Sequence, residues 1–258
     1  MILDDIKLAT QKRLESAKQS MPLEEVMKIA LDMENNNSFP FTKALEKSGM
    51  SFICEVKKGS PSKGIISADF PYMDIAKKYE KMGADAISVL TEPDFFKGSN
   101  AYLQEIHQKV KTPLLRKDFT VDKYMIYKAK TLGASAILLI CSILTKEEIK
   151  EYLYIAHSLG LSALVETHNE YEIETALECG AEIIGVNNRN LKTFDVDIST
   201  SERLRKYIPE DKIFVAESGM HQPEDIQRMK NIKADAVLIG EAFMRCDNPA
   251  ELLKSFKE

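Results

Sequence analysis

The sequence contains no tryptophan, only four cysteines and no excess of basic residues. The cysteines lie far apart, and no two have the spacing of a zinc site or a redox-active dithiol, so we expect small buried side chains and no metal. The 35 basic and 40 acidic residues give a net charge of −5. This balance disfavours a nucleic acid as a partner.

Long apolar segments are also missing. No run approaches the ~20 residues that a transmembrane helix needs, and the first residues carry Asp4, Asp5 and Lys7 where a signal peptide has a basic start and an apolar run. We therefore expect a cytoplasmic protein that does not use a membrane. The chain has no Gly-x-Ser-x-Gly sequence and no Walker sequence, which argues against a serine hydrolase and a P-loop nucleotide site.

Short apolar runs recur along the chain, and a longer charged stretch with helical spacing follows each of them. The runs are almost continuously apolar, which is typical of strands that are covered on both faces of a parallel sheet. Glycine often stands just before a run, as in Gly83-Ala84-Asp85-Ala86, where it can end the preceding helix. The eight runs are 52–56, 86–90, 113–115, 136–141, 163–165, 183–186, 213–216 and 236–239.

This alternation predicts one α/β domain over residues 1–258. Eight parallel units can close into a barrel or form an open sheet. We favour the (β/α)8 barrel (TIM barrel), because the count is eight and no glycine-rich dinucleotide motif follows the first run. Two helix starts are also predicted: the Thr-x-x-Glu capping box of Thr145 and Glu148, and Asn248-Pro249.

Residues 1–50 precede the first run, and segments 2–18 and 22–34 have helical spacing. The barrel is therefore expected to carry an N-terminal helical extension. Such an extension can cover the bottom of the barrel or form a wall of the active site. The sequence alone favours neither position.

Most of the runs end in charged or amide side chains. Active sites of (β/α)8 barrels lie at the carboxyl ends of the strands, so these side chains are expected to meet in one pocket. Ammonium and carboxylate groups in a closed pocket shift one another's pKa values, as acid–base catalysis requires. The candidate catalytic residues are Glu55, Lys57, Lys117, Glu166 and Asn187.

The seventh and eighth runs end in the small residues Ser218-Gly219 and Gly240. Barrels of this type often bind phosphate at these two positions through free backbone N–H groups. We therefore expect a small phosphorylated substrate. His168 and His221 lie near strand ends, but they lack the spacing of metal ligands, and no metal site is predicted.

The strand-end sequences closely resemble the motifs of the indole-3-glycerol phosphate synthase family, from about residue 50 to residue 245. The resemblance implies a tryptophan-biosynthesis enzyme, a carboxy-lyase without a cofactor. It would close 1-(2-carboxyphenylamino)-1-deoxyribulose 5-phosphate to indole-3-glycerol phosphate with loss of carbon dioxide and water. We expect a monomer or a weak homodimer. The matching segments are Glu55 to Gly64, Val89 to Pro93 with Phe96 and Gly98, Leu115 to Phe119, Leu164 to Glu166, Ile184 to Leu191 and Ala216 to Gly219.

The resemblance also implies individual roles. Lys117 matches the general acid of the family and Glu166 matches its base, while Lys57 either holds the substrate carboxylate or shares the proton transfers. Glu55 lies on the same strand face as Lys57, and we expect it to pair with Lys57 and Lys117. Asn187 and Arg189 match residues that hold the substrate hydroxyls. The substrate-binding residues implied are Ser60, Phe96, Arg189, Glu217, Ser218, Gly219, Gly240 and Glu241.

Some alternatives remain open. Phe96 lies either against the anthranilate ring or in the core. Glu241 stands where some relatives have serine, so phosphate contact there is expected through the backbone N–H or not at all. Two other functions are considered: a Schiff-base aldolase or isomerase that uses Lys117 or Lys57 as a nucleophile of depressed pKa, and a phosphate-binding barrel without catalysis.

Overall fold

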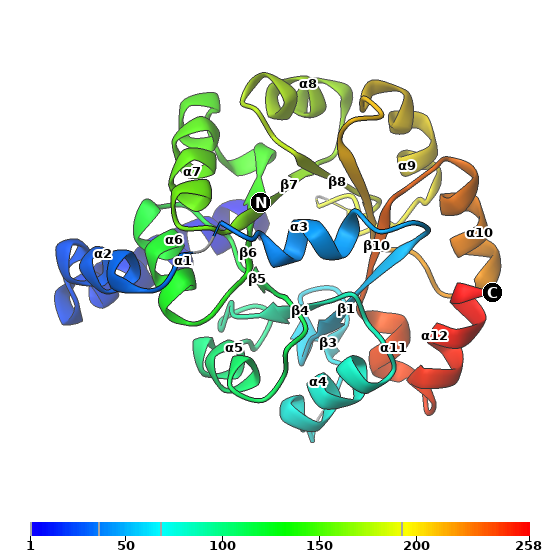
Figure 1. Cartoon of the computed structure of the whole chain (residues 1–258), viewed down its shortest axis with the longest axis horizontal. Helices are drawn as coiled ribbons and strands as arrows, with labels where there is room; N and C mark the ends of the chain where they lie inside the picture. The colour runs from blue at the N-terminus through cyan, green and yellow to red at the C-terminus, as the bar shows by residue number, and fades with distance from the viewer. Residues whose placement is uncertain (1, 36, 68, 192) are drawn as a thin grey trace.

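The computed structural model describes residues 2–35, 37–67, 69–191 and 193–258. Parallel strands form a closed ring in the order β1-β10-β9-β8-β7-β6-β5-β4, and helices surround the ring (Figure 1). The ring closes where β4 pairs with β1, so the predicted (β/α)8 barrel is confirmed. The barrel strands are β1 (Ser51–Val56), β4 (Ala86–Leu90), β5 (Leu114–Lys117), β6 (Ala136–Ile140), β7 (Ser162–Thr167), β8 (Ile183–Asn187), β9 (Ile213–Glu217) and β10 (Ala236–Ile239).

Several strands extend further toward their carboxyl ends than the apolar runs predict. β5 begins only after Pro113, which has no N–H to donate to the ladder, and it continues to Lys117. β7 and β9 likewise include Glu166 and Glu217, which are paired in register with Gly185 and Asn187 of β8. Lys117, Glu166 and Glu217 are therefore part of the sheet, and the backbone fixes their positions.

The helices on the outside of the barrel begin at the predicted caps. The Thr145 Oγ1 accepts the Glu148 N–H at 3.2 Å, and the Glu148 carboxylate accepts the Thr145 N–H at 2.8 Å. Asn248 caps the last helix, with Pro249 in its first turn. None of the described helices combines the length and hydropathy needed to cross a bilayer. The helices after β1 are α4 (Tyr72–Lys81), α5 (Asn100–His107), α6 (Lys123–Thr131), α7 (Lys146–Ser158), α8 (Glu170–Glu178), α9 (Ser199–Leu204), α10 (Pro223–Asn231), α11 (Glu241–Arg245) and α12 (Pro249–Lys257), with short 3-10 turns η1 (Cys141–Ile143) and η2 (Arg205–Tyr207).

The strands separate two apolar cores. In β1, Phe52 and Cys54 pack outward beneath the helices, whereas Ile53 packs inside the barrel with residues such as Leu164 and Val215. Side chains alternate between the two faces of a strand. The same alternation turns the side chain two residues beyond an inward apolar residue toward the barrel axis. In β1, β5, β7 and β9 this next inward position holds Glu55, Lys117, Glu166 and Glu217.

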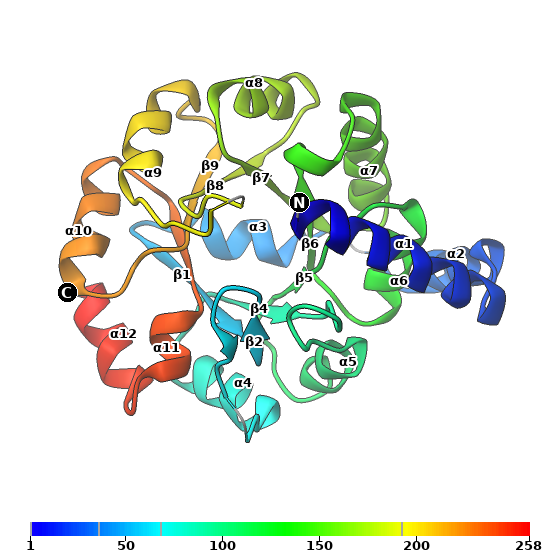
Figure 2. The same ribbon diagram turned by 180° about the vertical axis from the view of Figure 1, so that it is seen from behind.

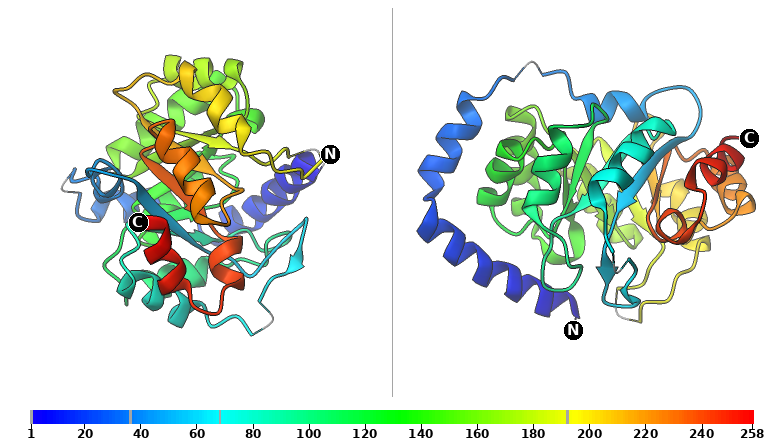
Figure 3. Two further views of the ribbon diagram at one scale, coloured as in Figure 1. Left: turned by 90° about the vertical axis from the view of Figure 1, so that its right-hand side faces the viewer. Right: turned by 90° about the horizontal axis from the view of Figure 1, so that it is seen from below.

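The N-terminal extension occupies both of the places considered for it. α1 (Ile2–Ser20) and α2 (Leu23–Asp32) confirm the two predicted helical segments, and the sequence analysis missed α3 (Pro40–Leu45). α3 crosses the amino-terminal end of the barrel, where Phe41 and Leu45 are fully buried (Figure 1). α1 lies at the opposite end (Figure 2), and α2 connects the two along the outside of the barrel (Figure 3).

Candidate active site

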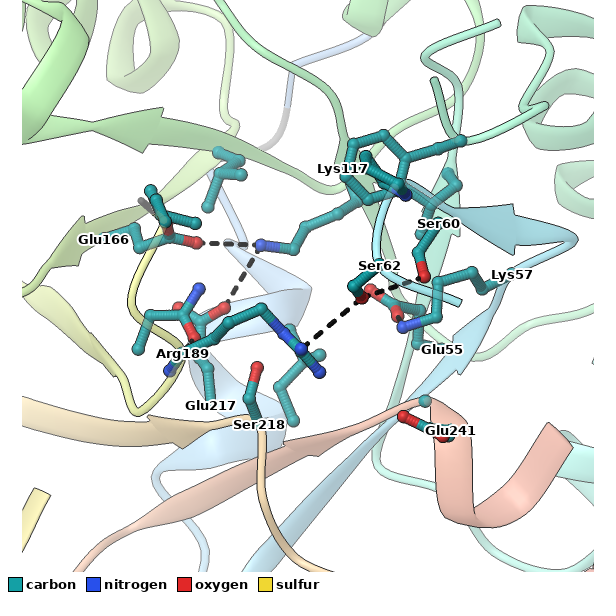
Figure 4. A pocket seen from close by; sticks show the side chains of 18 of the residues that line it. Glu55, Lys57, Ser60, Ser62, Lys117, Glu166, Arg189, Glu217, Ser218 and Glu241 are labelled. Atoms are coloured by element: carbon teal, nitrogen blue, oxygen red, sulfur yellow. Dashed lines mark hydrogen bonds and ion pairs between the residues drawn. The ribbon is translucent and has the colours of Figure 1, made fainter. Parts of the chain in front are cut away.

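A pocket lies at the carboxyl ends of the barrel strands (Figure 4), and residues of α1 are part of its lining. β1, β5, β7, β8 and β9 each contribute a charged or amide side chain to it, and the loops after these strands complete its rim. The structure brings all of the predicted site residues to this one pocket. They are Glu55, Lys57, Ser60, Phe96, Lys117, Glu166, Asn187, Arg189, Glu217, Ser218, Gly219, Gly240 and Glu241.

Lys117 lies at the centre of the charged group. Its Nζ donates to the Oε2 atoms of Glu166 and Glu217, at 3.0 and 3.1 Å (Figure 4). Burial by itself lowers the pKa of Lys117, but the surrounding carboxylates outweigh it and hold the pKa above its ordinary value. Lys117 is therefore a protonated donor, and the arrangement disfavours the neutral amine that a Schiff-base mechanism needs.

Glu166 is held as a carboxylate. Burial raises its pKa, but the charges of Lys117 and His168 and the hydrogen bonds from Lys117 and Asn187 more than compensate, so the pKa lies below its ordinary value. The Asn187 Oδ1 accepts the Arg189 N–H at 3.0 Å. This bond orients the Asn187 amide so that its NH2 group is available to Glu166. With its lowered pKa, Glu166 is ionised at neutral pH and can accept a proton.

The pKa of Glu217 is shifted in the opposite direction from that of Glu166. Its burial, together with repulsion from Glu166, raises the pKa to about 7 despite the opposing charge of Lys117. Its Oε1 is buried and has no hydrogen-bond partner among the described residues. A Cβ at Gly185 would collide with this carboxylate, so the glycine makes room for it. The resemblance implies that Glu217 binds substrate, whereas in this structure it contacts Lys117.

Glu55 and Lys57 form a second charged pair, with Lys57 Nζ 2.6 Å from Glu55 Oε1. A Cβ at Gly240 would collide with this pair, so Gly240 gives it space as well as an N–H at the pocket rim. The prediction that Glu55 pairs with Lys117 is wrong, because among the described residues Lys117 forms its ion pairs with Glu166 and Glu217. Glu55 raises the pKa of Lys117 only at longer range. The barrel register places Lys117 closer to the carboxylates of β7 and β9.

One wall of the pocket is apolar. Phe96 packs against the inner core, with its ring centroid 5.8 Å from that of Phe119, and it also borders the pocket. Its contact with the anthranilate ring of a substrate stays a prediction. The buried carboxylate of Glu92 fixes this loop by accepting the Phe96 N–H at 3.0 Å. α1 adds Ile6, and the other apolar lining residues include Ile2, Leu3, Leu138 and Ile140.

The opposite rim is formed by turns with polar groups. Ser218 and Gly219 have φ angles of +66° and +92°, and only the glycine adopts this region without strain. The Arg189 Nη1 donates to the Phe194 carbonyl at 3.1 Å and lies 3.5 Å from Ser62 Oγ, which links two loops across the rim. The Glu241 carboxylate pairs with Arg245 at 3.1 Å, and phosphate contact through the Glu241 backbone N–H, or none at all, stays the prediction.

Sequence reasoning missed the contact of His168 with Glu166, directly behind the pocket. The position of His168 two residues after Glu166 in the chain is a signal, but its spacing from other histidines, the criterion for a metal site, does not reveal this contact. In the structure its imidazole lies between Glu166 and Glu172, at 3.4 and 3.2 Å. Among the described residues, no cluster of three or more His, Cys, Asp or Glu side chains is arranged to hold a metal ion.

Comparison with solved structures relates the chain to other barrels. The 3-hexulose-6-phosphate synthase from Salmonella typhimurium superposes with a TM-score of 0.67 at 14% identity, over 81% of this chain and 97% of that chain. KGPDC from Streptococcus mutans gives a TM-score of 0.62 at 12% identity, over 81% and 95% of the two chains. At these identities the likeness concerns the fold alone.

Comparison of sequences is more specific. The family model described as indole-3-glycerol phosphate synthase matches residues 3–256. The indole-3-glycerol phosphate synthase of Endomicrobium trichonymphae is 55% identical over 258 residues, which is 100% of both chains. That of Ruminiclostridium cellulolyticum is 52% identical over 255 residues and 98% of each chain. With the matched segments forming one pocket at the strand ends, the chain belongs to the indole-3-glycerol phosphate synthase family.

Proposed function

We propose that this chain is an indole-3-glycerol phosphate synthase, a carboxy-lyase that converts 1-(2-carboxyphenylamino)-1-deoxyribulose 5-phosphate to indole-3-glycerol phosphate. The single observation that carries the proposal is the Lys117 ammonium, held by Glu166 and Glu217 in a pocket with an apolar wall and a polar rim. Such a pocket offers a fixed acid, an ionised base and separate surfaces for an aromatic ring and a phosphate.

Lys117 is the proposed acid for ring closure. The aryl carbon that bears the carboxylate attacks the ribulose carbonyl, and negative charge develops on the carbonyl oxygen. A nearby ammonium lowers the barrier by donating a proton to that oxygen. The raised pKa of Lys117 keeps it protonated before the reaction. Loss of carbon dioxide then restores the aromatic ring.

Glu166 is the proposed base for the dehydration. This step removes a proton from the cyclised intermediate while a hydroxyl leaves as water, so it needs both a base and an acid. Glu166 has a lowered pKa and lies 3.0 Å from Lys117 Nζ. Lys57, oriented by Glu55, is placed to hold the substrate carboxylate or to share in these proton transfers.

The two sides of the pocket orient the substrate in this proposal. The anthranilate ring lies against the apolar wall that includes Phe96 and Ile6, and the phosphate lies at the turn of Ser218 and Gly219 and at Gly240. Asn187 and Arg189 hold the hydroxyls of the sugar, and Ser60 lies at the edge of the substrate. The proposed reaction needs no cofactor, and we expect a cytoplasmic enzyme that acts as a monomer or a weak homodimer.

The experiment that tests the function is a fluorescence assay for the indole product, with purified, chelator-treated protein and the carboxyphenylamino sugar phosphate. Lys117→Met is expected to lower kcat by at least ~10², because it removes the acid while nearly keeping side-chain length. Lys123→Met is the matched control, since Lys123 is exposed and pairs with Glu151 on the barrel surface. Its kcat is expected to equal that of the wild type.

Lys117→Met leaves two buried carboxylates without their shared cation, so unfolding is measured in parallel. The double variant with Glu217→Gln removes one carboxylate together with the ammonium and keeps the charge balance. Wild-type turnover in Lys117→Met would refute the assignment of Lys117. Absence of indole product from the wild type would refute the function, and a borohydride-trapped adduct between Lys117 and a keto-sugar phosphate would favour an aldolase.

A further inference from the structure

His168 lies outside the pocket lining, directly behind Glu166. It follows the end of β7 and precedes α8, so its backbone belongs to the loop that joins the two elements. The His168 N–H donates to the Glu172 Oε2 at 2.8 Å, and its Nδ1 lies 3.2 Å from the same oxygen. One carboxylate at the start of α8 therefore holds both the main chain and the ring of His168.

The other ring nitrogen faces the proposed base. His168 Nε2 lies 3.4 Å from Glu166 Oε1, and among the described residues this buried nitrogen has no hydrogen-bond partner that could turn it elsewhere. The second oxygen of Glu166, Oε2, accepts from Lys117 at 3.0 Å. Glu166 is thus held from two sides, by an ammonium in the pocket and by an imidazole behind it.

Glu172 is a rigid support for this imidazole. Its N–H donates to the Asn169 Oδ1 at 2.9 Å, and its Oε1 accepts from the Asn169 amide at 2.7 Å. Asn169 is the cap of α8, so the contact belongs to a structured helix start. The contact of Nδ1 with this helix start favours the ring orientation in which Nε2 faces Glu166.

We propose that His168 is a positioning residue of the active site, which orients the carboxylate of Glu166 by linking it to Glu172 at the start of α8. The inference deepens the proposed function and rests on it for the role of Glu166 as base. His168 does not border the pocket and does not itself touch the substrate. Its effect on the reaction passes through Glu166.

The groups around His168 favour its charged form. Glu166 of β7, Glu172 of α8 and Glu217 of β9 face it, and the thiol of Cys141 in η1, whose own pKa burial raises, is a further neighbour of Glu166 and Glu172. Burial lowers the pKa of His168, but the hydrogen bond to Glu172 and the three carboxylates outweigh it and raise the pKa above its ordinary value. A protonated ring places a positive charge 3.4 Å from the Glu166 Oε1 and so stabilises Glu166 as a carboxylate.

The first test compares His168→Gln with His107→Gln, an exposed histidine on α5. In His168→Gln, kcat is expected to fall about ten-fold, because the base is no longer held in its productive orientation. The acidic limb of the kcat/KM profile is expected to move to higher pH, since Glu166 loses a neighbouring positive charge. KM is expected to change little, and His107→Gln should match the wild type in every parameter.

The second test does not depend on catalysis. The chain has four histidines, so the imidazole proton resonances can be assigned by substitution and titrated by NMR. In Glu166→Gln and in Glu172→Gln, the pKa of His168 is expected to fall, because each change removes a carboxylate in contact with the ring. Unfolding curves establish that the variants are folded.

The outcomes separate the two proposals. An unmoved acidic limb in His168→Gln together with an unchanged His168 titration in Glu166→Gln would overturn the positioning role, even if indole forms at the normal rate. A wild type that forms no indole, but whose His168 titration responds to Glu166→Gln, would refute the function and leave the contact intact.

Discussion

Lys117 shares its charge between two carboxylates, and this shapes the chemistry of the pocket. Of the three acidic residues close to it, Glu55 is paired with Lys57, which leaves Glu166 and Glu217 on one ammonium. Because both carboxylates are buried, their mutual repulsion favours protonation of one of them. Asn187 and His168 support the charge of Glu166. Glu217 lacks this support, so Glu217 is the residue that takes the proton.

This difference predicts a pH-dependent stability. Because the pKa of Glu217 is raised from 4.5 to about 7 in the folded protein, the folded state binds a proton between these values more tightly than the unfolded chain does. The stabilisation is fully present below about pH 4.5 and is lost as the pH rises through 7. As the pH rises from 4 to 8, the unfolding free energy of the wild type is therefore expected to fall by about 3 kcal/mol relative to that of Glu217→Gln.

Urea unfolding at a series of pH values measures this difference. Glu15→Gln on the exposed face of α1 is the control, and its stability curve is expected to run parallel to that of the wild type. If the curve of Glu217→Gln is also parallel, Glu217 does not titrate in this range, and the division of charge between Glu166 and Glu217 is different from the one described.

The residues that could be predicted from sequence are those whose position follows from a strand end alone. Lys117 and Glu166 each follow an apolar run and Glu55 lies near the end of one, and the alternation of strand side chains turns them inward. Their partners could not be predicted, because the choice between Glu55 and Glu217 for Lys117 depends on the register between strands distant in the chain. Gly185 was missed for the same reason, since its role appears only beside Glu217 of the next strand.

At the scale of elements, local sequence predicts the start of a long helix well, but it does not reveal a short helix. α7 starts at a capping box that the sequence predicts, and it buries Ile149, Tyr152 and Leu153. α3 has only six residues and enters from Phe39 with a φ of +41°, so neither a periodic pattern nor a side-chain cap announces it. Tertiary packing against the bottom of the barrel determines this helix.

The capping box of α7 provides a test at this scale. Thr145→Ala removes the acceptor of the Glu148 N–H and is expected to lower the unfolding free energy by about 1 kcal/mol. Chemical unfolding measures the loss, and Thr145→Ser, which keeps the hydroxyl, should recover most of it. Equal stability of the alanine and serine variants would mean that the side-chain hydroxyl does not stabilise the start of this helix.

At the scale of the whole molecule, one continuous N-terminal segment connects the two ends of the barrel. It closes the bottom with α3, passes the side with α2 and reaches the rim of the pocket with α1 (Figure 3). The eight strand units, together with the absence of a glycine-rich dinucleotide motif after the first, favour the closed barrel from the sequence. The path of the extension could not be predicted, because the contacts that determine it join residues far apart in the chain, such as Lys7 Nζ and the Ile143 carbonyl at 2.7 Å.

Arg13 holds α1 to the barrel rim, and this contact is expected to influence the pocket. Its guanidinium pairs with Asp94 and, at 2.8 Å, with the fully buried Glu92, which also fixes the loop of Phe96. Ionic hydrogen bonds to a buried carboxylate are stronger than exposed ion pairs. Arg13→Gln is therefore expected to loosen α1, with its amide hydrogens exchanging about ten-fold faster.

The same substitution is expected to raise KM with little effect on kcat, because α1 carries Ile2, Leu3 and Ile6 at the apolar wall, while the proposed acid and base lie on barrel strands. Hydrogen exchange followed by mass spectrometry localises the loosening to residues 2–20, and steady-state kinetics measure KM. Lys12→Gln, one residue away and exposed, is the control. If Arg13→Gln and Lys12→Gln exchange equally slowly, the packing of Ile6 and Leu14 holds α1 without help from Arg13, and the pocket wall does not depend on the ion pair.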